Sequence, residues 1–236
     1  MRSIFACAGE QHRWGNYMNQ PKHLVAVNGL PLLKRNIELF NKFFKNTKVY
    51  VSVRTEELRD IYSVDSDINF FVPKTIEAGE PLYKTLIPFL QTIDEDVLIL
   101  LGDVVFSEDC VKKMKINTAK QEFNVYGRKY GSTITGCKWG ELFAFYIPQS
   151  FKDNFIGAVS AVEKLYENKK VNRFSGWEII SYIYSGNTPD DISQVFNNRL
   201  FPSGFIEIDD ETEDFDYPED YDRYLSLVLQ RSQFKN

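Results

Sequence analysis

Two basic residues, Arg13 and Lys22, lie in polar segments that follow a short apolar run, an arrangement that could bind phosphate groups. The run covers residues 4–8 and ends at Gly9, which is the pattern of a buried strand that leads into a turn. Glycine lets the backbone approach a ligand closely, and exposed amides beside two cations suit the oxygens of a polyphosphate. The residues alone also allow an ordinary strand–loop–strand segment with two solvated cations.

One carboxylate, Asp103, comes directly after the strand-like segment 96–101 and Gly102. The apolar residues of this segment are typical of a central strand, and ligands of open α/β sheets lie at the carboxyl ends of the strands. Mg²⁺ prefers one or two carboxylates together with phosphates and water, so Asp103 could hold it there. The alternative is that Asp103 caps the next helix. Ser107 is the better cap, so the pattern favours the magnesium site.

A second group of carboxylates lies in the segment 209–222, which is rich in aspartate and glutamate. Runs of acidic residues are usually solvated faces, so composition alone assigns no site within this segment.

The elements that must position these residues follow from apolar periodicity and from turn residues. We expect strands over residues 4–8, 48–53, 68–72, 96–101, 123–126, 141–147 and 205–208. Helices are expected over 32–44, 82–90, 107–114, 151–166, 176–184 and 218–230, with a short helix after Thr55. Strands that alternate with helices predict an α/β fold with a mixed, mostly parallel sheet flanked by helices.

Composition sets further bounds on the class of protein. The 236 residues suffice for one domain with a substantial core, and no repeat or linker divides them, so we expect a single domain over 1–236. The net charge of −5 argues against a nucleic-acid binder. Three widely spaced cysteines indicate neither a disulfide framework nor a zinc cluster. With no secretion signal and no membrane-spanning run in the sequence, we expect a cytoplasmic protein without a membrane partner.

Three segments near the N-terminus resemble a known signature. Residues 7–14 (Cys-Ala-Gly-Glu-Gln-His-Arg-Trp), 21–22 (Pro-Lys) and 29–33 (Gly-Leu-Pro-Leu-Leu) are similar to Ala-Ala-Gly-x-Gly-x-Arg-Met, Pro-Lys and Gly-x-Pro-Leu-Leu. These motifs belong to the nucleotidyltransferases that activate sugar and alcohol phosphates, with MobA-like and cytidylyltransferase-like members. Two positions depart from the signature. Trp14 replaces the methionine, and Gln11 places a side chain where the backbone of a second glycine approaches the nucleotide.

Two downstream segments extend this resemblance over the whole chain. Residues 102–106 are similar to the family's Gly-Asp-x-x-Phe motif, and 214–221 to its Asp-x-Asp-Thr-Pro-Glu-Asp-Leu ending. The resemblance implies that Asp216 and Asp214 approach the same Mg²⁺ as Asp103. Tyr217 stands in place of the threonine.

The resemblance also implies a fold and an activity. The fold would be the Rossmann-like GT-A type, with a nucleotide-binding half over about 1–110 and an acceptor-binding half over about 111–236 that includes the C-terminal helix. A nucleoside triphosphate and a phosphorylated sugar or small alcohol would give a nucleoside diphosphate-linked product and pyrophosphate. Compact members are often cytidylyltransferases, which slightly favours CTP, and a homodimer is compatible with this class.

Roles for individual residues follow from the same resemblance. Arg13 and Lys22 are expected to be catalytic. The nucleotide would contact Ala6, Ala8, Gly9, Glu10, Gln11, Arg13, Lys22, Gly79, Lys84 and Gly102. On the acceptor side, Trp139 could stack on a substrate or pack in the core, and Glu141 opens the strand beside it. Two other functions remain open: a GT-A type glycosyltransferase that uses a nucleotide sugar, and a non-catalytic nucleotide-binding protein.

Overall fold

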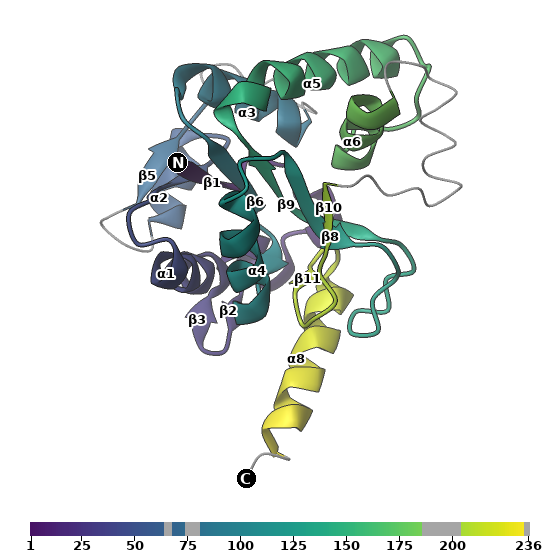
Figure 1. Ribbon diagram of the computed structural model, residues 1–236. Coiled ribbons are helices and arrows are strands. Elements are labelled where there is room, and N and C mark those ends of the chain that lie inside the picture. Colours follow the sequence, from purple (N-terminus) through teal and green to yellow (C-terminus); the bar gives the residue numbers. More distant parts are fainter. Residues whose placement is uncertain (64–67, 74–80, 186–203, 234–236) are drawn as a thin grey trace.

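The computed structural model describes residues 1–63, 68–73, 81–185 and 204–233 and contains a central seven-stranded sheet (Figure 1). The strand order is β10-β8-β9-β6-β1-β4-β5. The bounds are β1 Arg2–Ala6, β4 Lys48–Ser52, β5 Asn69–Phe71, β6 Val97–Leu101, β8 Asn124–Arg128, β9 Glu141–Ile147 and β10 Phe205–Glu207. Strand β9 runs antiparallel to β6 and β8, and the other neighbouring pairs are parallel. The expected mixed, mostly parallel sheet is confirmed.

Seven helices of the described residues accompany this sheet. Their bounds are α1 Leu32–Phe43, α2 Glu56–Tyr62, α3 Leu82–Thr92, α4 Glu108–Thr118, α5 Lys152–Glu167, α6 Gly176–Ser185 and α8 Pro218–Gln233. Short 3-10 turns are η1 His12–Trp14, η2 Tyr17–Asn19, η3 Lys22–Leu24 and η4 Gln149–Phe151. Every helix and strand expected from the sequence is present, with bounds shifted by a few residues.

The helices form two layers because successive residues of a strand point to opposite faces of the sheet. Phe5, Leu98 and Leu100 face the layer that contains α1, α2 and α4. Ile4 and Ile99 face the layer that contains α3, α5 and α6 (Figure 1). A strand between two helical layers is buried on both faces, which explains the apolar character of β1 and β6.

Side-chain hydrogen bonds fix the starts of two helices. Thr55 Oγ1 accepts a hydrogen bond from the Leu58 amide at 3.3 Å, and Ser107 Oγ accepts one from the Cys110 amide at 2.9 Å. Because Ser107 is the cap of α4, Asp103 is not needed for that purpose.

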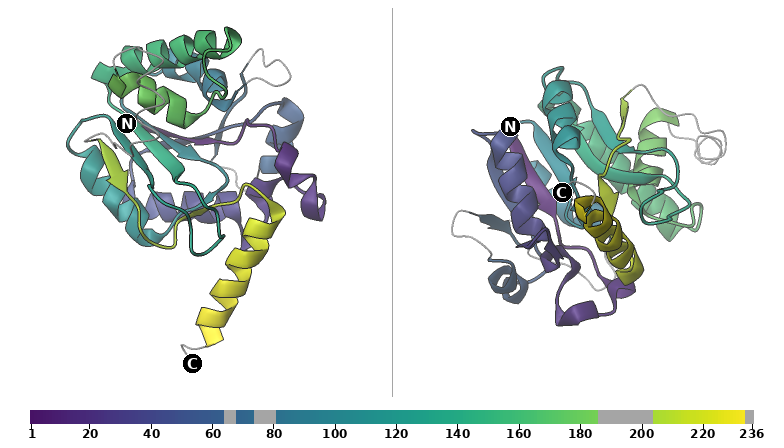
Figure 2. Two further views of the ribbon diagram at one scale, coloured as in Figure 1. Left: turned by 90° about the vertical axis from the view of Figure 1, so that its right-hand side faces the viewer. Right: turned by 90° about the horizontal axis from the view of Figure 1, so that it is seen from below.

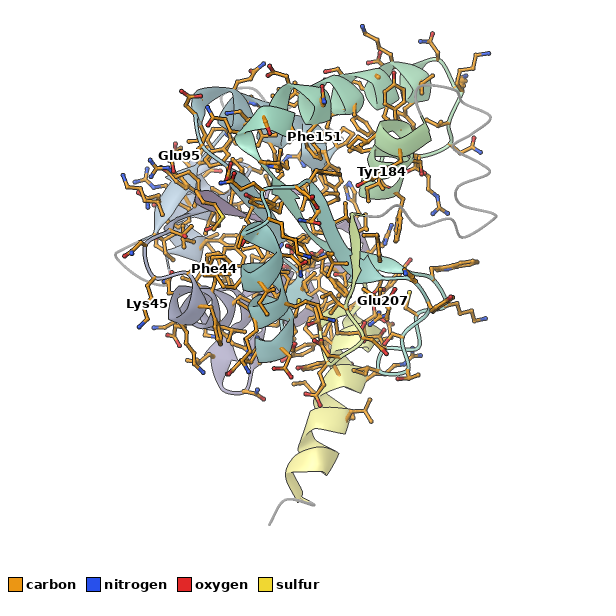
Figure 3. The ribbon with its side chains drawn as sticks, viewed as in Figure 1. Phe44, Lys45, Glu95, Phe151, Tyr184 and Glu207 are labelled. Atoms are coloured by element: carbon orange, nitrogen blue, oxygen red, sulfur yellow. The ribbon has the colours of Figure 1, made fainter. Side chains whose placement is uncertain are left out.

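Aromatic side chains pack in the layer that contains α1. Phe44, labelled in Figure 3, stacks on Phe40 with ring centroids 4.2 Å apart.

Two small sheets were not expected from the sequence. Strands β2 Ala26–Val27 and β3 Leu30–Pro31 form a hairpin, and β7 Val104–Val105 pairs antiparallel with β11 Glu213–Asp214. Two-residue strands carry no readable periodicity, so only the fold reveals them. Helix α8 begins beside β11, and its C-terminal end projects from the body (Figures 1 and 2). Among the described helices, none combines the length and apolar character needed to cross a lipid bilayer.

Candidate active site

Three carboxylates meet at the carboxyl end of β6. Asp103 lies in the turn between β6 and β7, and Asp214 ends β11, opposite Val104. The Phe215 amide donates to the Asp103 carbonyl at 3.2 Å, which holds the next residues close to the same turn. One carboxylate oxygen from each of Asp103, Asp214 and Asp216 lies within 4.8 Å of the others. The small β7–β11 sheet therefore assembles the three aspartates expected from the sequence.

Both predicted cations reach this carboxylate cluster, which we define as Asp103, Asp214 and Asp216. Lys22 Nζ donates to Asp103 Oδ2 and lies 3.3 Å from the Phe215 carbonyl. Arg13 Nη1 donates to Asp216 Oδ2. Lys22 is buried, whereas the side chain of Arg13 is 57% exposed and thus accessible to a ligand.

The electrostatics of the cluster show an excess of negative charge. Burial is the largest influence on Asp103 and acts to raise its pKa, but the charges of Lys22 and His23 and the hydrogen bond from Lys22 together hold that pKa below its usual value. Burial is likewise the largest influence on Lys22 and acts to lower its pKa, but the three carboxylates together, led by Asp103, raise the pKa above its usual value. At Asp214 the charge of Lys22 does not compensate: burial, followed by the charges of Asp103 and Asp216, raises its pKa well above the ordinary value.

A divalent cation fits the residues that are present. Asp214 Oδ1 is buried and has no hydrogen-bond partner among the described residues. A buried polar atom without a partner is costly, and carboxylate oxygens are the ligands that Mg²⁺ prefers. The three carboxylates and the unpartnered oxygen could thus hold a divalent cation.

The side chain of Gln11 is hydrogen-bonded to two other parts of the chain. Its Oε1 accepts a hydrogen bond from the Lys22 amide at 2.7 Å, and its Nε2 donates to the Tyr62 hydroxyl at 3.1 Å. Both polar atoms of the Gln11 side chain, which belongs to the phosphate loop, are thus bonded to groups of the protein itself. Here the phosphate loop means residues 9–13.

Two glycines beside the cluster differ in what surrounds them. A Cβ added at Gly9 would meet only Leu82 Cδ1, at 3.9 Å, among the described atoms. A Cβ added at Gly102 would overlap Cys7 Sγ and lie 3.1 Å from His23 Cδ2. The fold therefore requires glycine at Gly102, whereas the described atoms leave room for a Cβ at Gly9.

The remaining predicted nucleotide residues occupy different places. Ala6 and Ala8 are buried, which leaves their backbone as the part able to meet a ligand. Glu10 forms an ion pair with Arg54 at 3.1 Å. Lys84 Nζ forms an ion pair with Glu163 of α5 at 2.7 Å. Gly79 lies outside the described residues.

Trp14, which replaces the methionine of the signature, anchors the segment after the phosphate loop. It is 2% exposed and contacts Tyr17 and Tyr221 edge to face, with centroids 5.5 and 6.2 Å apart. Phe215 and Tyr224 belong to the same buried cluster. The N-terminal segment is thereby packed against the start of α8, as Figure 2 shows for the purple and yellow parts of the chain.

Sequence reasoning missed a buried ion cluster behind Asp214. Arg128 Nη2 lies 2.6 Å from Glu141 Oε2 and 2.5 Å from Glu213 Oε1. Ser132 Oγ donates to the other oxygen of Glu213, which directly precedes Asp214. A charged residue that ends an apolar strand, as Arg128 does, was the available signal, since a buried charge needs a partner.

The two predicted acceptor residues differ in exposure. Glu141 is held by Arg128, and burial raises its pKa to about 7. Trp139 is 76% exposed, so the alternative that it packs in the core is wrong.

Comparisons with known proteins agree with the fold. No model of a protein family matches the chain. The bifunctional protein GlmU of Methanocaldococcus jannaschii is 25% identical over 120 residues, which cover 50% of this chain and 29% of that protein. GlmU of Methanococcus vannielii is 26% identical over 121 residues, which cover 50% of this chain and 28% of that protein. The matched stretch thus spans less than a third of these curated relatives.

Solved structures match over nearly the whole chain. A UDP-glucose pyrophosphorylase complexed with UDP-glucose has a TM-score of 0.60 at 10% identity, covering 97% of this chain and 98% of that one. The 4-diphosphocytidyl-2C-methyl-D-erythritol synthase of Anaerococcus prevotii has a TM-score of 0.56 at 12% identity, and the match covers 96% of this chain and 95% of that one. The CTP:phosphocholine cytidylyltransferase of Streptococcus pneumoniae has a TM-score of 0.53 at 17% identity, and the match covers 97% of this chain and 98% of that one. The chain has the fold of these nucleotidyltransferases.

Proposed function

We propose that the chain is a nucleotidyltransferase that joins a nucleoside triphosphate to a phosphorylated sugar or small alcohol and releases pyrophosphate. One observation carries this proposal: Lys22 and Arg13 converge on the carboxylate cluster, in which Asp214 Oδ1 is buried and has no hydrogen-bond partner in the described part of the chain. The shared fold with enzymes named as pyrophosphorylases and cytidylyltransferases supports the same class.

The roles of the chain's own groups follow from their chemistry. Arg13 and Lys22 would donate hydrogen bonds to triphosphate oxygens and offset the charge that develops on the leaving pyrophosphate. Mg²⁺ held by the three aspartates would supply further charge neutralisation when bound. Gly9, where the described atoms leave room for a Cβ, would let the backbone approach the phosphates.

The attacking group needs no protein base. A phosphate monoester has a second pKa of about 6, so near neutral pH it is mostly dianionic and already nucleophilic. Catalysis would then consist of positioning the acceptor in line with the α-phosphorus and stabilising charge. The site's composition of carboxylates and cations is in keeping with this chemistry.

The division of labour along the chain is part of the proposal. We assign residues 1–110 to the nucleotide and residues 111–236 to the acceptor within one domain. Strands of both halves belong to the same sheet, and Asp214 and Asp216 of the second half join Asp103 of the first, which favours a single unit. Glu141 and Trp139 would lie on the acceptor side.

A panel of substrates tests the proposal. The four nucleoside triphosphates are combined with sugar, polyol and amino-alcohol phosphates, and pyrophosphate is measured with Mg²⁺ present. We expect release with a cognate pair, and the highest rate with CTP. Nucleotide binding without release for every pair would indicate a non-catalytic protein, and cleavage of a nucleotide sugar would indicate a glycosyltransferase.

The variant Gly9→Ala tests whether Gly9 lies against the phosphates, and a comparison with Gly102 distinguishes this role from a structural one. We expect Gly9→Ala to keep parental stability, because its Cβ would meet no tight contact with the residues that the structure describes. The KM for the triphosphate should rise about tenfold, as one displaced backbone hydrogen bond would give. Thermal unfolding and initial rates of pyrophosphate release measure the two effects.

The matched control is Gly102→Ala, whose Cβ would overlap Cys7 Sγ. Overpacking of this kind typically costs about 1–3 kcal/mol of stability. A parental KM for Gly9→Ala would show that the phosphates do not approach this glycine.

A further inference from the structure

The side chain of Gln11 connects two parts of the candidate site that are separate in sequence. Its Oε1 accepts from the backbone amide of Lys22 at 2.7 Å, and its Nε2 lies 3.1 Å from the Tyr62 hydroxyl. Tyr62, in the last turn of α2, is 0% exposed. The Tyr62 hydroxyl in turn lies 2.6 Å from His23 Nδ1. One polar chain thus joins the phosphate loop, η3 and α2.

The direction of each hydrogen bond follows from the donors available. A backbone amide can only donate, so the atom of Gln11 that faces Lys22 must be the oxygen, and the amide nitrogen then faces Tyr62. Since the tyrosine hydroxyl accepts from Gln11, its own proton is available to His23 Nδ1. Every polar atom along this path has a partner, as a rigid buried network requires.

This network acts on the catalytic groups through the backbone. Gln11 lies two residues after Gly9 and two before Arg13, and its oxygen holds the amide of Lys22, whose Nζ reaches Asp103. The bond therefore fixes the position of Lys22 relative to the loop that carries Arg13. The glycine that the similar signature has at this position offers no side chain for such a bond.

Resting on the proposed function, we propose that Gln11 is a positioning residue, which with Tyr62 and His23 sets the phosphate loop and Lys22 in register before the nucleotide binds. Fixing the geometry beforehand removes an ordering cost from the reaction, and loosening it lowers kcat/KM. Gln11 acts through Lys22 and need not contact the substrate.

The test uses variants that preserve size and remove hydrogen bonding. Gln11→Met and Tyr62→Phe are compared with Gln91→Met and Tyr166→Phe, which change the same residue types at exposed positions of α3 and α5. In the ligand-free protein we expect the Lys22 amide to exchange its hydrogen about tenfold faster in Gln11→Met, with the β1 amides unchanged. NMR measures this residue by residue.

The kinetic expectation is that kcat/KM falls about tenfold in Gln11→Met and in Tyr62→Phe, with neither control affected. The double variant should lose little more than either single variant, because both changes break the same network. If Tyr62→Phe does not fold, Gln11→Met alone decides the question.

Three outcomes would overturn the proposal. The first is that the Lys22 amide of Gln11→Met exchanges its hydrogen at the parental rate. The second is that this amide exchanges faster while kcat/KM stays parental. The third is that the β1 amides of Gln11→Met exchange faster by the same factor as the Lys22 amide, which would mean that Gln11 has a purely structural role. If the parent releases no pyrophosphate with any substrate pair, the proposed function fails, and triphosphate affinity measured by equilibrium dialysis replaces kcat/KM in the same comparison. A tenfold weaker affinity of Gln11→Met for the triphosphate would then support a positioning role for Gln11, and a parental affinity would overturn it.

Discussion

Replacing Asp103 or Asp216 by asparagine is expected to lower magnesium-dependent pyrophosphate release about 1,000-fold. Each replacement keeps the shape of the side chain and removes one charge from the carboxylate cluster. An amide oxygen is a weaker ligand for a hard cation, and losing one preorganised electrostatic contact costs about 10²–10³ in rate. Pyrophosphate release measured against Mg²⁺ concentration should show both a lower maximum and a weaker dependence on the metal.

Glu219→Gln is the control for this prediction. Glu219 is exposed in the first turn of α8, belongs to the same acidic segment and loses the same charge. Its activity should stay near that of the parent. The double variant of Asp103 and Asp216 should lose little more than either single variant, since residues that act as one unit are not additive. Equal effects at Asp216 and Glu219 would mean that the segment acts only through its overall charge.

Lys22→Met is expected to reduce both activity and stability. The rate of pyrophosphate release at saturating substrate should fall about 10²–10³-fold, because the cation that the proposed function assigns to the phosphates is lost. The free energy of unfolding without metal should fall by about 3 kcal/mol, because Asp103 is left buried without its partner. Chemical denaturation in the presence of a chelator and initial-rate kinetics measure the two effects.

A second substitution separates these two losses. Adding Asp103→Asn to Lys22→Met removes the unpaired charge, so most of the stability should return while the activity stays low. Lys42→Met is the matched control, because Lys42 pairs with Glu108 on the exposed surface and such pairs contribute little. Parental turnover of Lys22→Met at saturating substrate would contradict a catalytic role for this lysine.

Local patterns were sufficient for much of the fold. The apolar residues of β1 and β6, the periodicity of α1 and the caps at Thr55 and Ser107 are properties of a few neighbouring residues. Such signals are readable without knowing what packs against them. The same holds for Asp103, because the carboxyl end of a central strand is a predictable place for a ligand.

The resemblance placed Asp214 and Asp216 in the site, and the tertiary structure supplied the reason. The β7–β11 pair that brings them to Asp103 has strands too short for any periodicity. Arg128 meets Glu213 across 85 residues, a pairing that no local pattern encodes. The acidic segment could therefore not be divided into site and solvated surface from its composition.

Gln11 illustrates what the sequence determined and what only the fold decided. The sequence established that a side chain replaces the glycine of the similar signature. Its direction depends on Tyr62, 51 residues away, and on an amide donor at Lys22. Secondary structure follows from neighbouring residues, whereas the partner of a polar side chain depends on which distant groups packing brings within hydrogen-bonding distance. For that reason the sequence predicted the elements and the candidate residues, and the tertiary structure determined how those residues are held.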